Sequence, residues 1–142
     1  MEIIFNQEFL DDLLVKAKDS PRLRQNFDLR TSTNDTSQRM MNALQPETEV
    51  PIHRHEDTTE TVICLSGKLE EIFYEEVVEY TREETSCTEE VLRKQMFKEV
   101  SRHLLCPAEG VYGIQIPAGV WHTIRVIEPS VIFEAKDGAF RM

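Results

Sequence analysis

Two histidines and a glutamate near the middle of the chain have the types and spacing of metal ligands. His53 and His55 lie two residues apart, and Glu60 follows them in the segment HRHEDTTE. Alternate side chains of a β-strand point to the same face, so His53 and His55 can share one face. A turn through residues 57–59 would return the chain and present Glu60 at the start of the next strand.

A third histidine, His122, follows a turn in the distant segment IPAGVWH. Together the three imidazoles and the Glu60 carboxylate form a mixed nitrogen and oxygen donor set. Such a set suits one divalent transition metal, and Fe, Mn, Ni, Co, Cu and Zn all remain open. In phase with these ligands are apolar residues, which predict a largely dry pocket around the metal: Val62, Cys64, Ile114, Ile116, Ile124 and Val126.

The elements that must position these ligands read mainly as strands. From residue 38 onward the chain is rich in Val, Ile, Phe and Tyr and is punctuated by Pro and Gly turns, which is typical of an all-β sandwich or barrel. The candidate strands are 38–45, 48–54, 60–66, 69–74, 77–81, 111–116, 121–127 and 130–135.

Two segments favour helices instead. Residues 7–19 carry one apolar stripe, with Asn6 as a cap residue and Ser20-Pro21 as a stop. Residues 87–104 place apolar side chains four apart, with pairs of opposite charge at the same spacing. We therefore predict an N-terminal helix and a second helix inserted between strands around 87–104, and interpret His103 within it as a surface residue.

The combined motifs resemble those of the cupin superfamily. His53, His55, Glu60 and Gly67 match the first cupin motif from its HxH onward, with Glu47 near the position of its opening glycine. The second motif is matched by Pro117, Gly119 and His122, although Val126 stands where asparagine is usual. The resemblance implies a double-stranded β-helix, or jelly-roll barrel, over residues 37–142, with residues 1–36 as a helical extension packed on it.

A narrower resemblance is to the WbuC family of cupin metalloproteins. It is carried by the segments SPRLRQN, QRMMNALQP and IPAGVWHTI. Members are small bacterial proteins that accompany surface-polysaccharide genes, which implies a sugar or sugar acid as substrate. Cupins commonly dimerise, so the resemblance also implies a homodimer.

Composition limits the partners. Sixteen Lys and Arg against 26 Asp and Glu give a net charge of −10, which argues against nucleic acid and anionic membranes. No apolar run is long enough to span a bilayer, and the start of the chain lacks a signal peptide's pattern. Three cysteines without CxxC spacing (Cys64, Cys87 and Cys106) read as free thiols, so we expect a cytoplasmic protein.

Three functions remain open at this stage, and it is undecided whether the protein is an enzyme. The first is a metal-dependent isomerase, epimerase or lyase acting on a sugar or sugar acid. The second is an Fe(II)-dependent dioxygenase, and the third is a non-catalytic cupin that binds a small ligand. Candidates to hold a small, anionic substrate are Arg22, Arg24, Arg39 and Lys136. Lys136 and Glu134, on a late strand, are also candidate acid/base residues.

Overall fold

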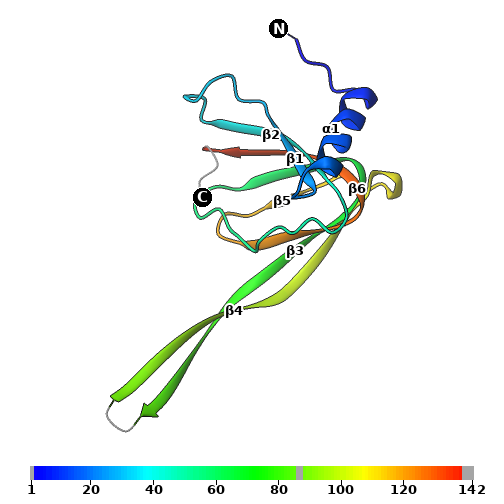
Figure 1. Ribbon diagram of the computed structural model, residues 1–142. Coiled ribbons are helices and arrows are strands. Elements are labelled where there is room, and N and C mark those ends of the chain that lie inside the picture. Colours follow the sequence, from blue (N-terminus) through cyan, green and yellow to red (C-terminus); the bar gives the residue numbers. More distant parts are fainter. Residues whose placement is uncertain (1, 86–87, 139–142) are drawn as a thin grey trace.

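The computed structural model describes residues 2–85 and 88–138, with the side chains of residues 83–90 left out. Along the chain the structure contains one helix, a pair of strands, two very long strands, a short 3-10 helix and two further strands (Figure 1). The elements are α1 (Gln7–Asp19), β1 (Arg24–Asp28), β2 (Ser37–Leu44), β3 (Glu60–Thr85), β4 (Thr88–Leu105), η1 (Pro107–Glu109), β5 (Gly113–Ile116) and β6 (Trp121–Asp137).

The strands form one antiparallel sheet in the order β1-β2-β6-β3-β4, and β5 pairs with the start of β3. β3 and β6 lie side by side and are paired from Thr61↔Ala135 to Tyr74↔Trp121, and the sheet curls around an interior (Figure 1). The prediction of an all-β fold with an N-terminal helix is therefore confirmed. β1, which was not predicted, belongs to the first 36 residues and extends the sheet through its pairing with β2.

Helix α1 begins and ends where the sequence predicts. The Asn6 side chain accepts a hydrogen bond from the Phe9 amide at 2.9 Å, which caps the first turn. One face of the helix packs on the outer face of β2 and β6, in a cluster of Leu10, Leu13, Ala17, Met41, Ala43 and Val131. No helix among the described residues has the length and apolar character needed to cross a membrane.

The interior of the curled sheet holds a second apolar cluster, whose buried members are Leu44, Val62, Cys64, Leu69, Leu105, Ile116, Val126 and Ile132. Ile114 and Ile124 pack against it, so the predicted apolar wall is present. Burial raises the pKa of the Cys64 thiol to about 11, which disfavours the thiolate that metals bind. Cys64 and Cys106 are free and buried, whereas Cys87 lies outside the described residues.

The predicted helix at 87–104 is wrong, because residues 88–104 belong to β4; residue 87 lies outside the described residues. This strand pairs with β3 along its whole length, from Thr85↔Thr88 to Leu69↔Leu105. A spacing of four residues fits a helix, but it is also twice the two-residue repeat of a strand. The spacing of the apolar residues therefore cannot distinguish a helix from a strand here; these residues are Leu92, Met96, Val100 and Leu104. Pairing with β3 provides the hydrogen-bond partners of the β4 backbone.

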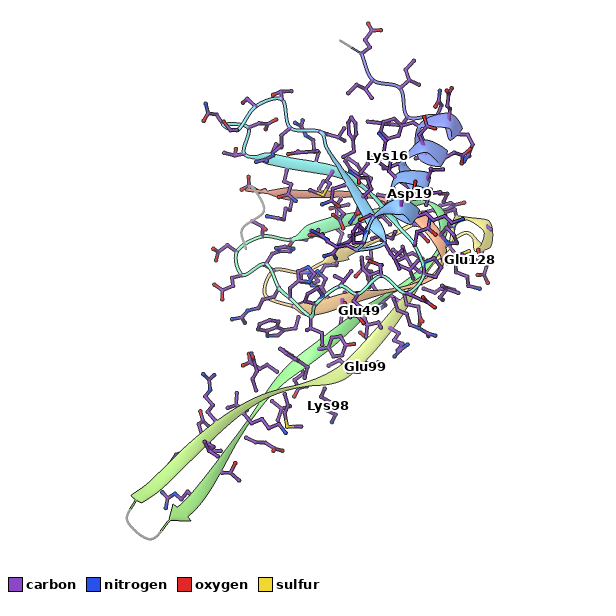
Figure 2. The ribbon with its side chains drawn as sticks, in the orientation of Figure 1. Lys16, Asp19, Glu49, Lys98, Glu99 and Glu128 are labelled. Atoms are coloured by element: carbon purple, nitrogen blue, oxygen red, sulfur yellow. The ribbon has the colours of Figure 1, made fainter. Side chains whose placement is uncertain are left out.

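The outer parts of β3 and β4, residues 75–85 and 88–98, form a two-stranded ribbon that we call the arm. The last pairing of β3 with β6 is Tyr74↔Trp121, so beyond it β3 contacts β4 alone among the described strands. The arm extends away from the barrel (Figure 1), and Lys98 and Glu99 mark the region where it leaves (Figure 2). Phe97 anchors its base, with its ring centroid 4.9 Å from that of Trp121.

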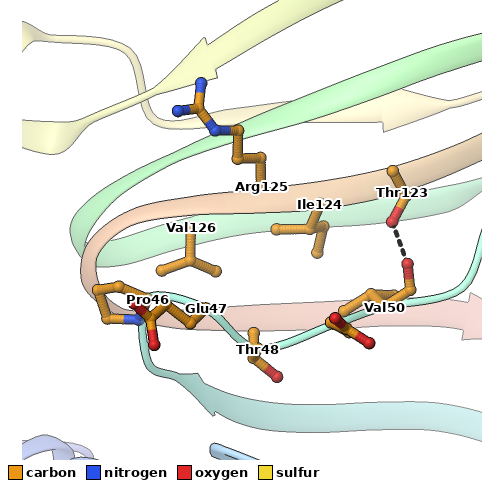
Figure 3. A pocket seen from close by; sticks show the side chains of 9 residues that line it. Pro46, Glu47, Thr48, Val50, Thr123, Ile124, Arg125 and Val126 are labelled. Carbon is orange, nitrogen blue, oxygen red and sulfur yellow. Dashed lines mark hydrogen bonds between the residues drawn. The ribbon is translucent and has the colours of Figure 1, made fainter.

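The predicted strand at 48–54 is also wrong for most of its length. Only His53 makes a strand-like bridge, to His122, through two backbone hydrogen bonds of 3.0 and 2.8 Å. The segment leading to it crosses β6, where the Thr123 hydroxyl donates to the Val50 carbonyl (Figure 3). The bridge matters because it places two of the candidate ligands side by side.

Candidate metal centre

Three imidazoles converge at one place in the interior. His53, His55 and His122 each offer a ring nitrogen, and these atoms all lie within 4.8 Å of one another. Ligands held at about 2.0–2.2 Å from one ion lie roughly 3–4 Å apart, so only a small adjustment separates this arrangement from coordination. The ring centroids are 4.3 Å apart for His53 and His122 and 5.3 Å for His53 and His55. The three histidines therefore fit a metal site.

Backbone carbonyls fix the orientation of two of these rings. Nδ1 of His53 lies 2.8 Å from the Pro51 carbonyl, and Nδ1 of His122 lies 2.9 Å from the Val120 carbonyl. A carbonyl oxygen can only accept, so each Nδ1 carries the proton and donates it. Nε2 of each ring is then left with a free lone pair, which is the form that binds a metal.

His122 shows most directly that a cation fits. Its side chain is buried, and Nε2 has no hydrogen-bond partner among the described residues. Burial lowers the pKa of His122 to about 4, helped by the neighbouring His53 and His55, so the ring is neutral at neutral pH. A buried acceptor without a partner is costly, and coordination of an ion by Nε2 would remove that cost.

Glu60 lies at the edge of the same cluster, at the start of β3. It is buried, and its Oε2 is 2.9 Å from Nε2 of His55. The turn predicted from the sequence thus brings the carboxylate back to His55. The group of side chains close enough to share one ion consists of the three histidines and does not include Glu60.

Two positions of the cupin-like first motif have a left-handed backbone. Gly67 has φ +97°, and a Cβ there would meet the Pro129 carbonyl and Ser130, so the motif glycine is required. Glu47, near the position of the missing first glycine, has φ +75°. The backbone therefore keeps the left-handed turn that a glycine would favour, although a side chain is present.

The four candidate substrate residues are not gathered in one place. Arg24 lies in β1 opposite the interior residue Leu44, and Arg22 and Arg24 line an open pocket of about 240 Å³ outside the histidine cluster. Arg39 lies on the helix-facing side of β2 and pairs with Asp35 at 2.6 Å. Nζ of Lys136 donates to the Gly138 carbonyl at 3.0 Å.

Three polar residues line the interior near the histidines. Glu134 is partly buried, and burial together with the charge of Glu60 raises its pKa to about 8, against opposing effects of Arg24 and of a hydrogen bond from Asn42. Glu71 is fully buried. His103 is half-buried rather than a surface residue, and lies opposite Glu71 with its ring against Phe73 at 4.7 Å between centroids.

Sequence reasoning did not identify Glu71. The register between β3 and β6 shifts three times between Cys64 and Leu69, which reverses the phase of the strand. Before the shifts the even-numbered residues face the interior, and after them Leu69, Glu71 and Phe73 do. No signal in the sequence announces such a bulge, apart from the turn residues Ser66 and Gly67.

A groove of about 450 Å³ lies next to the site but does not include it. It runs between the segment 46–50 and residues 123–126 of β6, and none of the four candidate ligands lines it (Figure 3). This groove therefore does not lead a ligand directly to the histidines.

A curled antiparallel sheet with three histidines on its interior face defines a cupin-fold protein with a candidate metal site. The chain belongs to the family described as "Domain of unknown function (DUF6016)", which matches residues 5–85, more than half of its length. A search among curated proteins finds no match.

Solved structures share the fold at low sequence identity. TT1209 from Thermus thermophilus is 18% identical with a TM-score of 0.57, covering 97% of this chain and 98% of that chain. KdgF from Halomonas sp. is 13% identical with a TM-score of 0.55, covering 85% and 83%. An oxalate oxidase in complex with the substrate analogue glycolate is 11% identical with a TM-score of 0.54, covering 85% of this chain and 54% of that chain. At these identities the likeness extends to the fold alone.

Proposed function

We propose that this protein is a metal-dependent enzyme of the isomerase, epimerase or lyase type that acts on a sugar or sugar acid. The observation that carries the proposal is the convergence of three imidazoles within 4.8 Å, two of them oriented by backbone carbonyls. His53, His55, Glu60 and His122 would hold one divalent transition metal. Bound there, the metal would supply Lewis acidity toward a carbonyl or hydroxyl oxygen of the substrate.

The residues around the centre support a small oxygenated substrate. Four protein ligands leave one or two positions open on an octahedral ion, as in catalytic rather than closed structural sites. Glu134 retains a proton near neutral pH and lies on the interior face of β6, where it can exchange that proton with a bound molecule. The glycolate complex of the oxalate oxidase supports the idea that this fold accommodates a small hydroxy acid.

The finer expectations stay predictions within this proposal. They are the WbuC-like subtype, a bacterial role in surface-polysaccharide biosynthesis, a cytoplasmic location and a homodimer. The substrate role of Arg24 is favoured over that of Arg39, because Arg24 extends from the interior face of β1 whereas Arg39 is already paired with Asp35.

The test is metal content. We expect elemental analysis to find stoichiometric metal in the wild type. The double variant His53→Ala, His122→Ala should purify with a wild-type circular dichroism spectrum but without that metal. Unchanged metal content would refute the ligand assignment. Turnover with several divalent metals in the absence of oxygen would support the isomerase class, whereas oxygen uptake that depends on Fe(II) would replace it with the dioxygenase.

A further inference from the structure

Glu71 is an anomaly in the interior. Its side chain is completely buried, and neither Oε1 nor Oε2 has a hydrogen-bond partner among the described residues. Buried polar atoms are nearly always hydrogen-bonded, because leaving one unpaired costs about 1–3 kcal/mol. A carboxyl group with two such atoms indicates that a further molecule belongs beside it.

The strand register places Glu71 at the floor of the metal centre. It lies opposite Ile124 in β6, and the next interior residue of β3, Phe73, lies opposite His122. Glu71 and His122 are thus diagonal neighbours on one face, a separation of about 7–8 Å that a long side chain can bridge. On the other side of Glu71 the interior is closed by apolar residues, since Leu69 lies opposite Val126 and Leu105.

The charge state of Glu71 follows from its surroundings. Burial raises its pKa well above the ordinary value, and the carboxylates of Glu60 and Glu134 add to the effect. The other titratable groups near it are His122 in β6 and His103 in β4, and Nε2 of His103 is engaged with the Ser101 hydroxyl at 3.0 Å. The raised pKa favours the protonated form of Glu71, whose O–H group can act as a donor.

We propose that Glu71 donates a hydrogen bond to an oxygen of the exogenous ligand that occupies the open position beside the three histidines. The ligand is a small molecule with a hydroxyl or carboxylate oxygen. Water takes its place when no such molecule is bound. This inference rests on the proposed metal site and deepens it, because it assigns to the substrate a second contact, on the side away from the metal ligands. Glu71 is then a substrate-binding residue rather than a metal ligand.

The experiment uses the full chain loaded with Co(II) and titrated with formate, a small carboxylate, while the visible spectrum of the cobalt is recorded. Glu71→Leu removes the donor and should weaken formate binding by about tenfold, since a hydrogen bond to a charged group is of that size. Glu71→Gln keeps an N–H donor of similar shape and should bind formate within about twofold of the wild type. Glu70→Gln is the matched control, because Glu70 points to the other face of β3 and contacts Arg102 and Arg125.

Each outcome decides the matter. Weakened formate binding in Glu71→Leu, with rescue in Glu71→Gln and unchanged Co(II) affinity in both, supports the inference. Equal formate affinity in all variants overturns it and leaves Glu71 as a buried acid solvated by ordered water. A wild-type cobalt spectrum that formate does not change overturns it while metal binding stands. Failure of the wild type to take up Co(II) refutes the proposed function itself and this inference with it.

Discussion

Oε2 of Glu60 lies 2.9 Å from Nε2 of His55, so the carboxylate and the imidazole face each other through the atoms that would bind a metal. The pair is largely buried, with side chains 9% and 13% exposed, and their contact is therefore little screened by solvent. If both groups bind a metal ion at this centre, two coordinate bonds must replace the direct contact between them.

Removing the Glu60 carboxylate should weaken metal binding without unfolding the chain. We expect Glu60→Gln to raise the dissociation constant for Co(II) by at least about tenfold, since even residues that only orient metal ligands contribute that much. Isothermal titration calorimetry measures the change. Glu56→Gln is the control, because Glu56 lies in the same loop but pairs with Arg54 at the surface. Equal affinities for the two variants would exclude Glu60 as a ligand.

The raised pKa of Glu134 predicts a pH-dependent stability. The folded protein holds this proton up to about pH 8, whereas an unfolded glutamic acid releases it near its ordinary value of 4.5. Between these values the unfolded state is favoured by ionisation, so the contribution of Glu134 to stability falls as pH rises. The free energy of unfolding of Glu134→Gln, measured relative to that of the wild type, should therefore rise by on the order of 1–3 kcal/mol as the pH is raised from about 5 to about 8.

Chemical denaturation at several pH values, with chelator present, checks this prediction. Glu128→Gln serves as the control, because Glu128 is an exposed residue of the same strand (Figure 2). A constant difference between Glu134→Gln and the wild type across the pH range would contradict the expected titration.

Replacing Glu47 with glycine should stabilise the fold. Glu47 is exposed and has φ +75°, a conformation that costs a residue with a Cβ more than it costs glycine. We expect Glu47→Gly to raise the free energy of unfolding by about 0.5–1 kcal/mol, measured by urea denaturation. Glu49→Gly, at an exposed neighbour without positive φ, should lower it instead. If both substitutions changed the free energy of unfolding in the same direction, the positive φ of Glu47 could not explain the effect.

Shortening the arm should leave the metal centre intact. Val78 and Gln95 are paired, so residues 79–94 can be replaced by an Asn-Gly turn that closes the ribbon there. Phe97 and its contact with Trp121 are retained. We expect Co(II) affinity within about twofold of the wild type, because an isolated two-stranded ribbon adds little to the stability of the sheet it leaves.

A deeper cut that also removes Phe97 is the contrasting variant, since it uncovers Trp121 next to His122. This variant should lower the melting temperature measurably. Loss of Co(II) binding in the shorter deletion would show instead that the outer arm takes part in the metal site.

The sequence was a good guide where a short repeat fixes geometry. The two-residue spacing of His53 and His55 and the turn before Glu60 predict a shared face, and the structure brings these residues together with His122. It was a poor guide where two periods coincide, as for the four-residue spacing that made β4 look like a helix. The sequence also did not predict the inward position of Glu71, because that position depends on register shifts that only the pairing of β3 with β6 defines.

The two bonds from ring Nδ1 atoms to the Pro51 and Val120 carbonyls have a kinetic consequence. They select one tautomer for each ring in advance, so an arriving ion meets lone pairs that already point the right way. The rate of capture is then governed by how fast the ion sheds its own hydration shell. Ions that exchange water quickly will load first, whatever their final affinity.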